Sequence, residues 1–194
     1  SRKLGVVIGG GLPAREGIEL AKNVMSNPDC LDEVGIAATR LNATIIQQIL
    51  IEIGCNVAPV IPHDTNSASE LLANYNFVIM GGTKPGQTTD AVAVNLARDC
   101  SAAECIIATN VSHVYDKDPN TFPDAKPFTE MSIDELIEIT GTERMAPGQS
   151  AVVDPVAVNI AAVSKINLAV LDGRKVDLIE AALDGEEFYG TLVR

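Results

Sequence analysis

Residues 81–90 read Gly-Gly-Thr-Lys-Pro-Gly-Gln-Thr-Thr-Asp, between an apolar run, Phe77–Met80, and an alanine- and valine-rich helical pattern over 91–98. A strand that breaks into glycines and restarts as a helix is typical of an anion site. Glycines let the backbone approach an anion closely, and the first turn of a helix presents free N–H groups with positive partial charge. Thr88 and Thr89 add hydroxyl donors. The segment therefore predicts a phosphate site, and with it a nucleotide-binding or phosphoryl-transfer enzyme.

Two further loops follow predicted strands in the same way. Gly9, Gly10 and Gly11 end a strand over 4–8, and the polar loop 109–126 follows a strand over 104–108. Ligands of open α/β sheets lie beyond the carboxyl ends of the strands. Three such loops at one edge of a sheet therefore strengthen the case for a bound ligand.

Short apolar runs alternate with helical patterns along the whole chain of 194 residues. This alternation predicts an α/β fold, a three-layer α/β/α sandwich whose central sheet is mostly parallel. The predicted strands cover 4–8, 56–61, 76–80, 104–108, 167–171 and 189–193. The predicted helices cover 13–25, 34–53, 67–73, 88–100, 132–139, 154–165 and 175–183. Ser132 and Glu135 have the spacing of a capping box.

Composition limits the function classes. The net charge of −12 argues against binding to nucleic acid or to an anionic membrane surface. Walker A and zinc-ligand spacings are absent from the sequence. The four cysteines are expected to be reduced and mostly buried, and no signal peptide or membrane-spanning run is expected. These features favour a cytoplasmic protein.

Several motifs also have plainer interpretations. Segment 9–15 matches the dinucleotide fingerprint G-x-G-x-x-A, but no second strand leads to an acidic residue after it. A tight turn without a ligand stays open there. Asp32 either caps a helix or accepts hydrogen bonds from a ribose, and Arg40 is interpreted as a surface ion pair.

The loop 109–126 leaves similar alternatives. Asp118 either caps a turn or faces a ribose or a metal, and Tyr115 is a candidate to lie along a base. His113 is interpreted as an isolated, exposed histidine.

A family resemblance rests on these segments together. They are the glycine turn with Ala14-Arg15, Asp32–Ile36, Thr39–Ala43, Gly81–Ala91, Thr109–Pro119, Pro123–Lys126, Val153–Pro155 and Gly190-Thr191. In these motifs the chain resembles the amino-acid-kinase superfamily, and within it most closely the archaeal-type uridylate (UMP) kinases. The match runs in order along essentially the whole chain, and 83–90 is its most specific part.

The resemblance implies Mg²⁺-dependent transfer of the γ-phosphate of ATP to UMP, giving ADP and UDP. It implies one domain, 1–194, with a UMP-binding half over about 1–100 and an ATP-binding half over about 101–194. It also implies a homo-oligomer, a hexamer built from dimers, with the apolar helix 34–53 as an interface element.

The resemblance also implies roles for individual residues. UMP would be bound by Gly10, Asp32, Thr83, Lys84, Pro85, Gly86, Gln87, Thr88 and Thr89. ATP would be bound by Gly11, Arg15, Thr109, Asn110, Tyr115 and Asp118. The catalytic residues would be Arg15 and Asp90, and no metal ligand is implied.

The sequence departs from the family pattern in two respects. Ser112-His113 stands where family members usually have Asp-Gly, a pair whose glycine favours positive φ. Family members also begin with a further strand, a glycine-rich phosphate loop and two helical segments, and the strand at 4–8 is the first in this sequence. Two alternatives therefore stay open. One is a non-catalytic nucleotide- or oxyanion-binding storage protein of the same fold, and the other is a kinase for an acyl amino acid.

Overall fold

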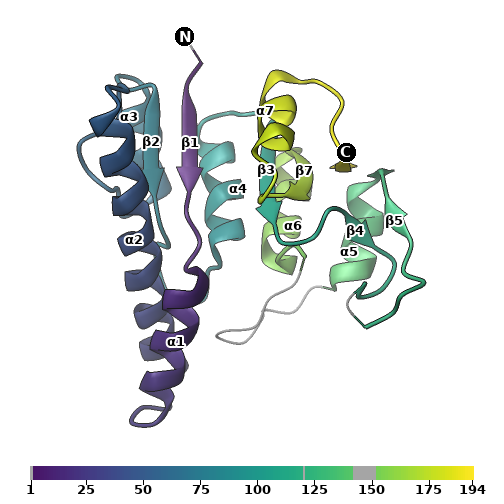
Figure 1. Ribbon diagram of the computed structural model, residues 1–194, viewed down its shortest axis with the longest axis horizontal. Coiled ribbons are helices and arrows are strands. Elements are labelled where there is room, and N and C mark those ends of the chain that lie inside the picture. The colour runs from purple at the N-terminus through teal and green to yellow at the C-terminus, as the bar shows by residue number, and fades with distance from the viewer. Residues whose placement is uncertain (1, 120, 142–151) are drawn as a thin grey trace. The chain divides into compact units, whose positions relative to one another are not determined.

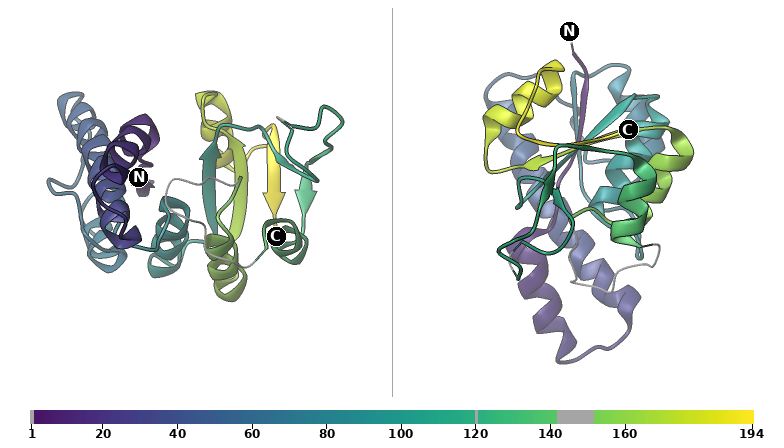
Figure 2. Two further views of the ribbon diagram at one scale, coloured as in Figure 1. Left: turned by 90° about the horizontal axis from the view of Figure 1, so that it is seen from below. Right: turned by 90° about the vertical axis from the view of Figure 1, so that its right-hand side faces the viewer.

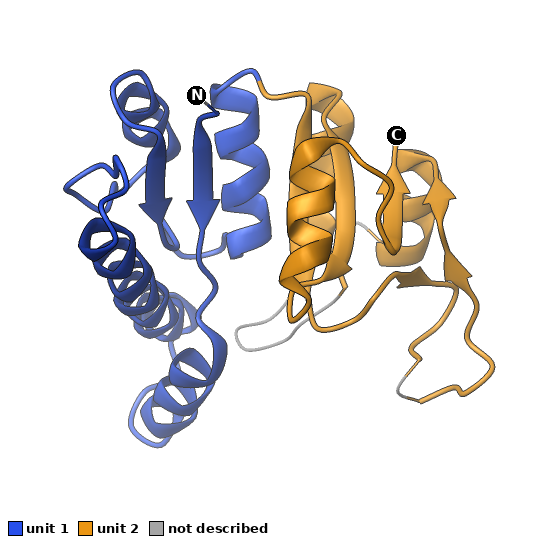
Figure 3. Ribbon diagram, turned by 45° about the horizontal axis from the view of Figure 1, so that its top comes forward, with its two compact units in different colours: residues 1–101, 144–149 blue, residues 102–143, 150–194 orange. Residues whose placement is uncertain are grey.

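The computed structural model describes residues 2–119, 121–141 and 152–194. They form two compact units, 1–101 and, from 102 onward, the rest of the described chain (Figure 3). Each unit has its own parallel strand pair and its own covering helices.

Unit 1 has two parallel strands and four helices. They are β1 (Leu4–Val7), α1 (Gly11–Lys22), α2 (Pro28–Glu52), α3 (Thr65–Leu72), β2 (Phe77–Met80) and α4 (Thr89–Asp99). β1 pairs with β2 from Leu4 opposite Phe77 to Val7 opposite Met80. In Figure 1, β1 runs directly into α1.

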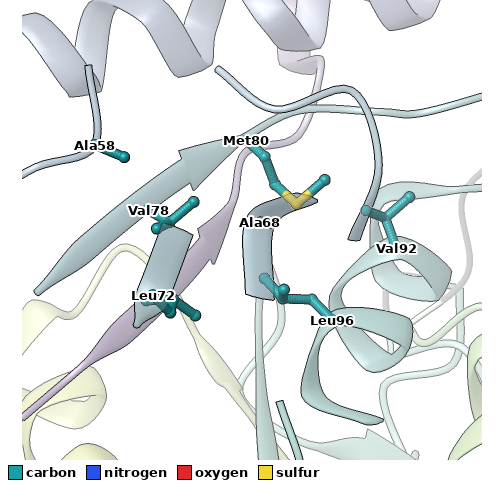
Figure 4. Packing of buried hydrophobic residues seen from close by; sticks show 7 residues of the cluster. All are labelled: Ala58, Ala68, Leu72, Val78, Met80, Val92 and Leu96. Atoms are coloured by element: carbon teal, nitrogen blue, oxygen red, sulfur yellow. The ribbon is translucent and has the colours of Figure 1, made fainter. Parts of the chain in front are cut away.

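The two faces of β2 alternate between two apolar clusters. On one face the buried residues are Ala58, Ala68, Leu72, Val78, Met80, Val92 and Leu96 (Figure 4). On the other face Ile79 packs with Ala43 of α2 and with Val57. Because both faces of the strand are covered, its sequence is a continuous apolar run.

Unit 2 combines a four-stranded sheet with a hairpin and three helices. They are β3 (Glu104–Thr109), β4 (Val114–Tyr115), β5 (Pro127–Phe128), β6 (Glu130–Met131), α5 (Ile133–Thr140), α6 (Pro155–Ser164), β7 (Asn167–Asp172), α7 (Val176–Asp184) and β8 (Gly190–Val193). The sheet order is β3-β7-β8-β6, with β3 and β7 parallel and β7 and β8 antiparallel. Helix α7 covers one face, and α5 and α6 lie on the other (Figure 2).

Two predicted elements of unit 1 were wrong in detail. The strand predicted over 56–61 is a single bridge between Val57 and Phe77. Pro59 and Pro62 lack the N–H groups that a longer ladder needs. Helix α2 begins at Pro28 rather than at 34, because Asn27 caps it by accepting the N–H of Asp29 at 2.9 Å.

Unit 2 holds three two-residue strands, β4, β5 and β6, that the sequence did not reveal. Elements of that length are too short to show a periodicity. The predicted capping box is confirmed, since the Ser132 and Glu135 side chains each bond to the other's backbone N–H.

The cysteines and the apolar helix need a correction each. Of the four cysteines, Cys105 is buried, Cys55 and Cys100 are partly buried, and Cys30 is exposed. Within the described residues, α2 is long and apolar enough to cross a membrane by length and composition, and 17% of its apolar window is buried. The sequence pattern had not indicated this, because polar residues interrupt the helix. Those polar residues hold it to unit 1, as described next.

Candidate functional site

The glycine turn after β1 is hydrogen-bonded to a side chain of α2. Asn42 Nδ2 donates to the carbonyl oxygens of Gly9 at 2.9 Å and Gly10 at 3.1 Å. Gly11, the first residue of α1, has a φ of +55°, which favours glycine. The amino end of α1 thus follows a turn whose carbonyl groups are already bonded elsewhere. Arg15 lies one turn along this helix and is exposed.

The loop after β2 rests directly on α2. The hydroxyl of Thr39 accepts the N–H of Gly82 at 2.7 Å and donates to the carbonyl of Ile36 at 2.6 Å. At Gly81, an added Cβ would lie 2.6 Å from Thr39 Oγ1 and 2.9 Å from the backbone nitrogen of Arg40. Glycine is therefore required at this position because the helix backbone occupies the space of a side chain.

Asp32 joins α2 to the middle of the same loop. Its Oδ2 accepts the N–H of Gly86 at 2.8 Å, and Gly86 has a φ of +84°. Within the loop, Thr83 Oγ1 donates to Gln87 Oε1 at 3.0 Å. The interpretation of Asp32 as a helix cap is wrong, since Asn27 has that role and Asp32 lies within the helix. Contact of Asp32 with a ribose stays a prediction.

The loop ends at the amino end of α4. Thr88 is the N-cap, its hydroxyl accepting the N–H of Ala91 at 3.3 Å, and Asp90 lies in the first turn. A Cβ on Gly9 would lie 3.7 Å from Thr89 Oγ1, so the glycine turn and this helix end are neighbours. Unit 1 therefore gathers the predicted residues Gly10, Gly11, Asp32, Thr83, Lys84, Pro85, Gly86, Gln87, Thr88, Thr89 and Asp90 around two helix N-termini.

Arg40 is not the surface ion pair that the sequence suggested. Its guanidinium donates to the carbonyl oxygens of Ile61 at 2.8 Å and Pro62 at 3.0 Å. Burial lowers the pKa of this guanidinium from its ordinary value. Arg40 thereby ties the segment before α3 to the helix that carries Asp32 and Thr39.

In unit 2, Thr109 is the last residue of β3 and Asn110 follows it, and the end of β7 lies beside them. Gly173 donates its N–H to the carbonyl of Thr109 at 2.8 Å. Arg174 forms a two-point ion pair with Asp172, Nε to Oδ1 and Nη2 to Oδ2, each 2.8 Å. Hydrogen bonds from Arg174 lower the pKa of Asp172 to about 2.

The loop after β7 is a second loop of unit 2 that was not predicted from the sequence. Its signal was present, because Asp172-Gly173-Arg174-Lys175 follows an apolar strand and precedes a helix, as 81–90 does. The pairing of β3 with β7 shows that it ends at the same sheet edge as Thr109.

His113 is buried, with 2% of its surface exposed, so its interpretation as an exposed histidine is wrong. Its Nδ1 lies 3.0 Å from Ser112 Oγ, and its ring meets that of Tyr189 edge-on at 4.5 Å. Ser112 Oγ in turn lies 2.9 Å from the hydroxyl of Tyr115. Ser112 and His113 are not among the positive-φ residues, so this loop forms without the positive φ that the Asp-Gly pair of the resembled family favours.

Tyr115 lies in β4, which pairs with β5, and one side chain joins both strands to β8. The hydroxyl of Thr191 accepts the N–H of Val114 at 2.9 Å and donates to the carbonyl of Phe128. Thr191 is fully buried. This contact gives the terminal Gly190-Thr191 motif a structural role.

Asp118 has the local role that its plainer interpretation gave it. Its Oδ2 accepts the hydroxyl of Thr121 at 2.9 Å, and its carbonyl accepts the N–H of Phe122 at 2.9 Å. A contact with a ribose or a metal stays a prediction. Within the described ranges, no cluster of three or more His, Cys, Asp or Glu side chains could hold a metal ion.

The burial of His113 predicts a pH-dependent stability. Burial lowers the pKa of His113 below 6.5, so between the two pKa values the unfolded chain binds a proton that the folded chain does not. The stabilisation is complete above about pH 6.5 and is lost as the pH falls. Urea unfolding at about pH 7 and about pH 5.5 should show a smaller loss of stability in His113→Phe than in the wild type.

Burial raises the pKa of Glu104, so its contribution to stability falls as the pH rises, opposite to the contribution of His113. Glu104 is present in both the wild type and His113→Phe, so its contribution cancels when the two losses of stability are compared. Equal losses in the two proteins would contradict the role given to His113.

Comparison with known proteins adds the family. The model of the amino acid kinase family matches residues 1–172. A uridylate kinase of Methanocaldococcus jannaschii is 39% identical over 181 residues, which cover 93% of this chain and 78% of that protein. One from Thermoplasma acidophilum is 36% identical over 192 residues, 99% of this chain and 82% of that protein.

Solved structures agree with these relatives. The crystal structure of a uridylate kinase from Archaeoglobus fulgidus superposes with a TM-score of 0.86 at 38% identity, over 100% of this chain and 85% of that one. A UMP kinase from Bacillus anthracis, at 20% identity and a TM-score of 0.78, shares the fold. The predicted α/β fold is thereby confirmed.

Proposed function

Because this chain belongs to the amino acid kinase family, we propose that it is a uridylate kinase, which transfers the γ-phosphate of ATP to UMP and gives ADP and UDP. One observation carries the proposal: the loop 81–89 is fixed on α2 through Thr39 and Asp32. The relatives from M. jannaschii and A. fulgidus, both named uridylate kinases, support it.

The proposed chemistry needs positioning more than it needs a base. An oxygen of the UMP phosphate attacks the γ-phosphorus of ATP, and the bond from that phosphorus to the oxygen shared with the β-phosphate breaks. Since the second pKa of a phosphate monoester is about 6, the attacking oxygen is already ionised near neutral pH. The protein's work is therefore to align the two phosphates and stabilise charge on the transferred group.

Unit 1 supplies the groups for that work in this proposal. Gly10 and Asp32 bind UMP together with the loop from Thr83 to Thr89. Gly11 and Arg15 lie by the ATP phosphates, where Arg15 stabilises the charge of the transferred group. Helix N-termini after the glycine turn and after Thr88 add positive partial charge.

Mg²⁺ fits this arrangement as an ion that arrives with ATP. It keeps several waters and takes one or two carboxylates plus substrate phosphates, so it needs no cluster of protein ligands. Asp90, in the first turn of α4, would orient a lysine or a metal-bound water. When bound, the ion neutralises phosphate charge.

Unit 2 supplies the adenosine contacts. Thr109 ends β3 and Asn110 follows it, Tyr115 follows the buried Val114, and Asp118 fixes the turn after them. We place the enzyme in the cytoplasm, where both nucleotides are available.

A coupled assay with ATP, Mg²⁺ and a panel of nucleoside monophosphates tests the proposal. UMP should give ADP and UDP in equal amounts, with UMP preferred over CMP and AMP. An acyl amino acid substrate should give no turnover. Nucleotide binding without turnover would favour the storage-protein alternative, for which the comparisons offer no support.

We further propose that α2 joins copies of this chain in a homo-oligomer, a hexamer assembled from dimers. Leu41, Ile45, Ile49 and Ile53 recur every four residues along the helix, and each is about half exposed or more. An apolar stripe of this size on a soluble protein usually marks an interface. Thr39, Asn42 and Gln47 of the same helix form hydrogen bonds within unit 1.

Charging this stripe should dissociate the oligomer. Ile45→Glu together with Ile49→Glu would bury two unpaired carboxylates in the interface, so light scattering after size exclusion should give a lower mass than the wild type. Val163→Glu, at a residue of unit 2 that is 87% exposed, is the matched control and should leave the mass unchanged. An unchanged mass in the double variant would exclude α2 from the interface.

A further inference from the structure

The pair Ser112-His113, which replaces the Asp-Gly of similar kinases, forms a connected network of polar groups with Tyr115. His113 Nδ1 is 3.0 Å from Ser112 Oγ, and Ser112 Oγ is 2.9 Å from the Tyr115 hydroxyl. The ring of His113 also lies 6.2 Å from that of Tyr115, edge to face. All three residues belong to the short segment between β3 and the end of β4.

His113, at the end of this network away from Tyr115, is held in place by its neighbours. His113 is 2% exposed and meets the ring of Tyr189 at an interplanar angle of 89°. Its neighbour Val114 is fixed by the hydroxyl of Thr191. Because burial lowers the pKa of His113, the ring is neutral near neutral pH. A fixed, neutral imidazole can hold a serine hydroxyl in one orientation.

We propose that Ser112 and His113 are positioning residues that hold the Tyr115 phenol and thereby set the affinity of this chain for the base of its phosphate donor. The inference rests on the proposed function, in which Tyr115 contacts the adenosine of ATP. A ring that is already ordered loses less conformational entropy when a ligand binds. Ser112 and His113 act through Tyr115 and do not touch the nucleotide.

Removing the Ser112 hydroxyl, the middle group of the network, should weaken the binding of ATP and not that of UMP. Ser112→Ala should raise the KM for ATP about fivefold, the effect of one neutral hydrogen bond, with kcat and the KM for UMP unchanged. Ser112→Thr keeps the hydroxyl and should restore the wild-type KM. His113→Phe keeps the edge-on packing against Tyr189 but removes the ring nitrogens, and should match Ser112→Ala.

A double-mutant cycle separates positioning from general loosening. Tyr115→Phe removes the same hydrogen bond as Ser112→Ala, so the two changes together should raise the KM for ATP no more than the larger single effect. Tyr75→Phe, which removes a phenol from unit 1, is the control and should leave this KM unchanged. Additive effects in the cycle, or wild-type ATP affinity in Ser112→Ala and His113→Phe, would overturn the proposal.

Direct calorimetric titration with ATP keeps the two proposals distinguishable. A wild type that binds ATP without phosphorylating UMP contradicts the uridylate kinase function alone, and the titrations of Ser112→Ala and His113→Phe still test the positioning role. A wild type that turns over, with variants that bind ATP equally well, contradicts the positioning role alone.

Discussion

Gly81→Ala is expected to lower the stability of this protein, because the added methyl group would meet the backbone of helix α2. The new Cβ would lie 2.6 Å from Thr39 Oγ1 and 2.9 Å from both Arg40 N and the carbonyl carbon of Thr39. Two of these three atoms are backbone atoms of α2, which cannot move aside as a side-chain tip does. The loop or the helix must shift, at a cost of about 3 kcal/mol in the free energy of unfolding.

Thermal unfolding measures this effect, and a loss of about 3 kcal/mol lowers Tm by roughly 6–12 °C in a chain of this size. Gly35→Ala is the matched control, because its Cβ would meet only the tip of Ile18, at 3.3 Å, and alanine favours a helix interior. Adding Thr39→Ala to Gly81→Ala should not restore stability, since the backbone contacts remain. Recovery in that double variant would mean that the side chain alone causes the clash.

Asp32→Ala should lower kcat/KM for UMP by about ten- to a hundredfold, the range expected when a charged hydrogen bond is lost. The carboxylate accepts the N–H of Gly86 at 2.8 Å, and that bond holds the loop in the shape that the proposal assigns to phosphate binding. Without it, the loop must be ordered when UMP binds. The KM for ATP should change little.

Asp32→Asn separates the two roles of this side chain. Its amide oxygen can still accept from Gly86, so this variant keeps the loop but loses the charge. Recovery of most activity would assign Asp32 to loop geometry, and no recovery would assign it to direct contact with UMP. Glu33→Ala, at the exposed neighbour on the same helix, should behave as the wild type. A fall in Glu33→Ala equal to that in Asp32→Ala would refute the specific role of Asp32.

The sequence was sufficient for features encoded within a few neighbouring residues. The helix and strand pattern predicted the fold class, and the Ser132–Glu135 spacing predicted a capping box that the structure contains. The glycines of 81–90 indicated close backbone approach, and at Gly81 the helix α2 makes that approach. Each of these signals is local, so it can be interpreted without knowledge of what packs against it.

The features that the sequence did not reveal depend on distant partners. Asp32 resembled a helix cap because its bond to Gly86 spans 54 positions. His113 resembled an exposed residue because its burial depends on Tyr189. Arg40 resembled an ion-pair residue because its carbonyl acceptors, at Ile61 and Pro62, lie 21 and 22 positions away in the sequence. In each case tertiary contact determines the role of a residue that local pattern leaves ambiguous.

Helix α2 bears both the groups that hold the two glycine loops and the stripe of Leu41, Ile45, Ile49 and Ile53. A ligand in the loops and a second copy on the stripe would therefore both contact elements fixed on the same helix. Thermodynamic linkage requires that whatever factor assembly adds to the affinity for UMP, UMP adds to the affinity of assembly. Where assembly raises the affinity for UMP, diluting the protein would lower its activity and UMP would promote assembly, without a separate regulatory site.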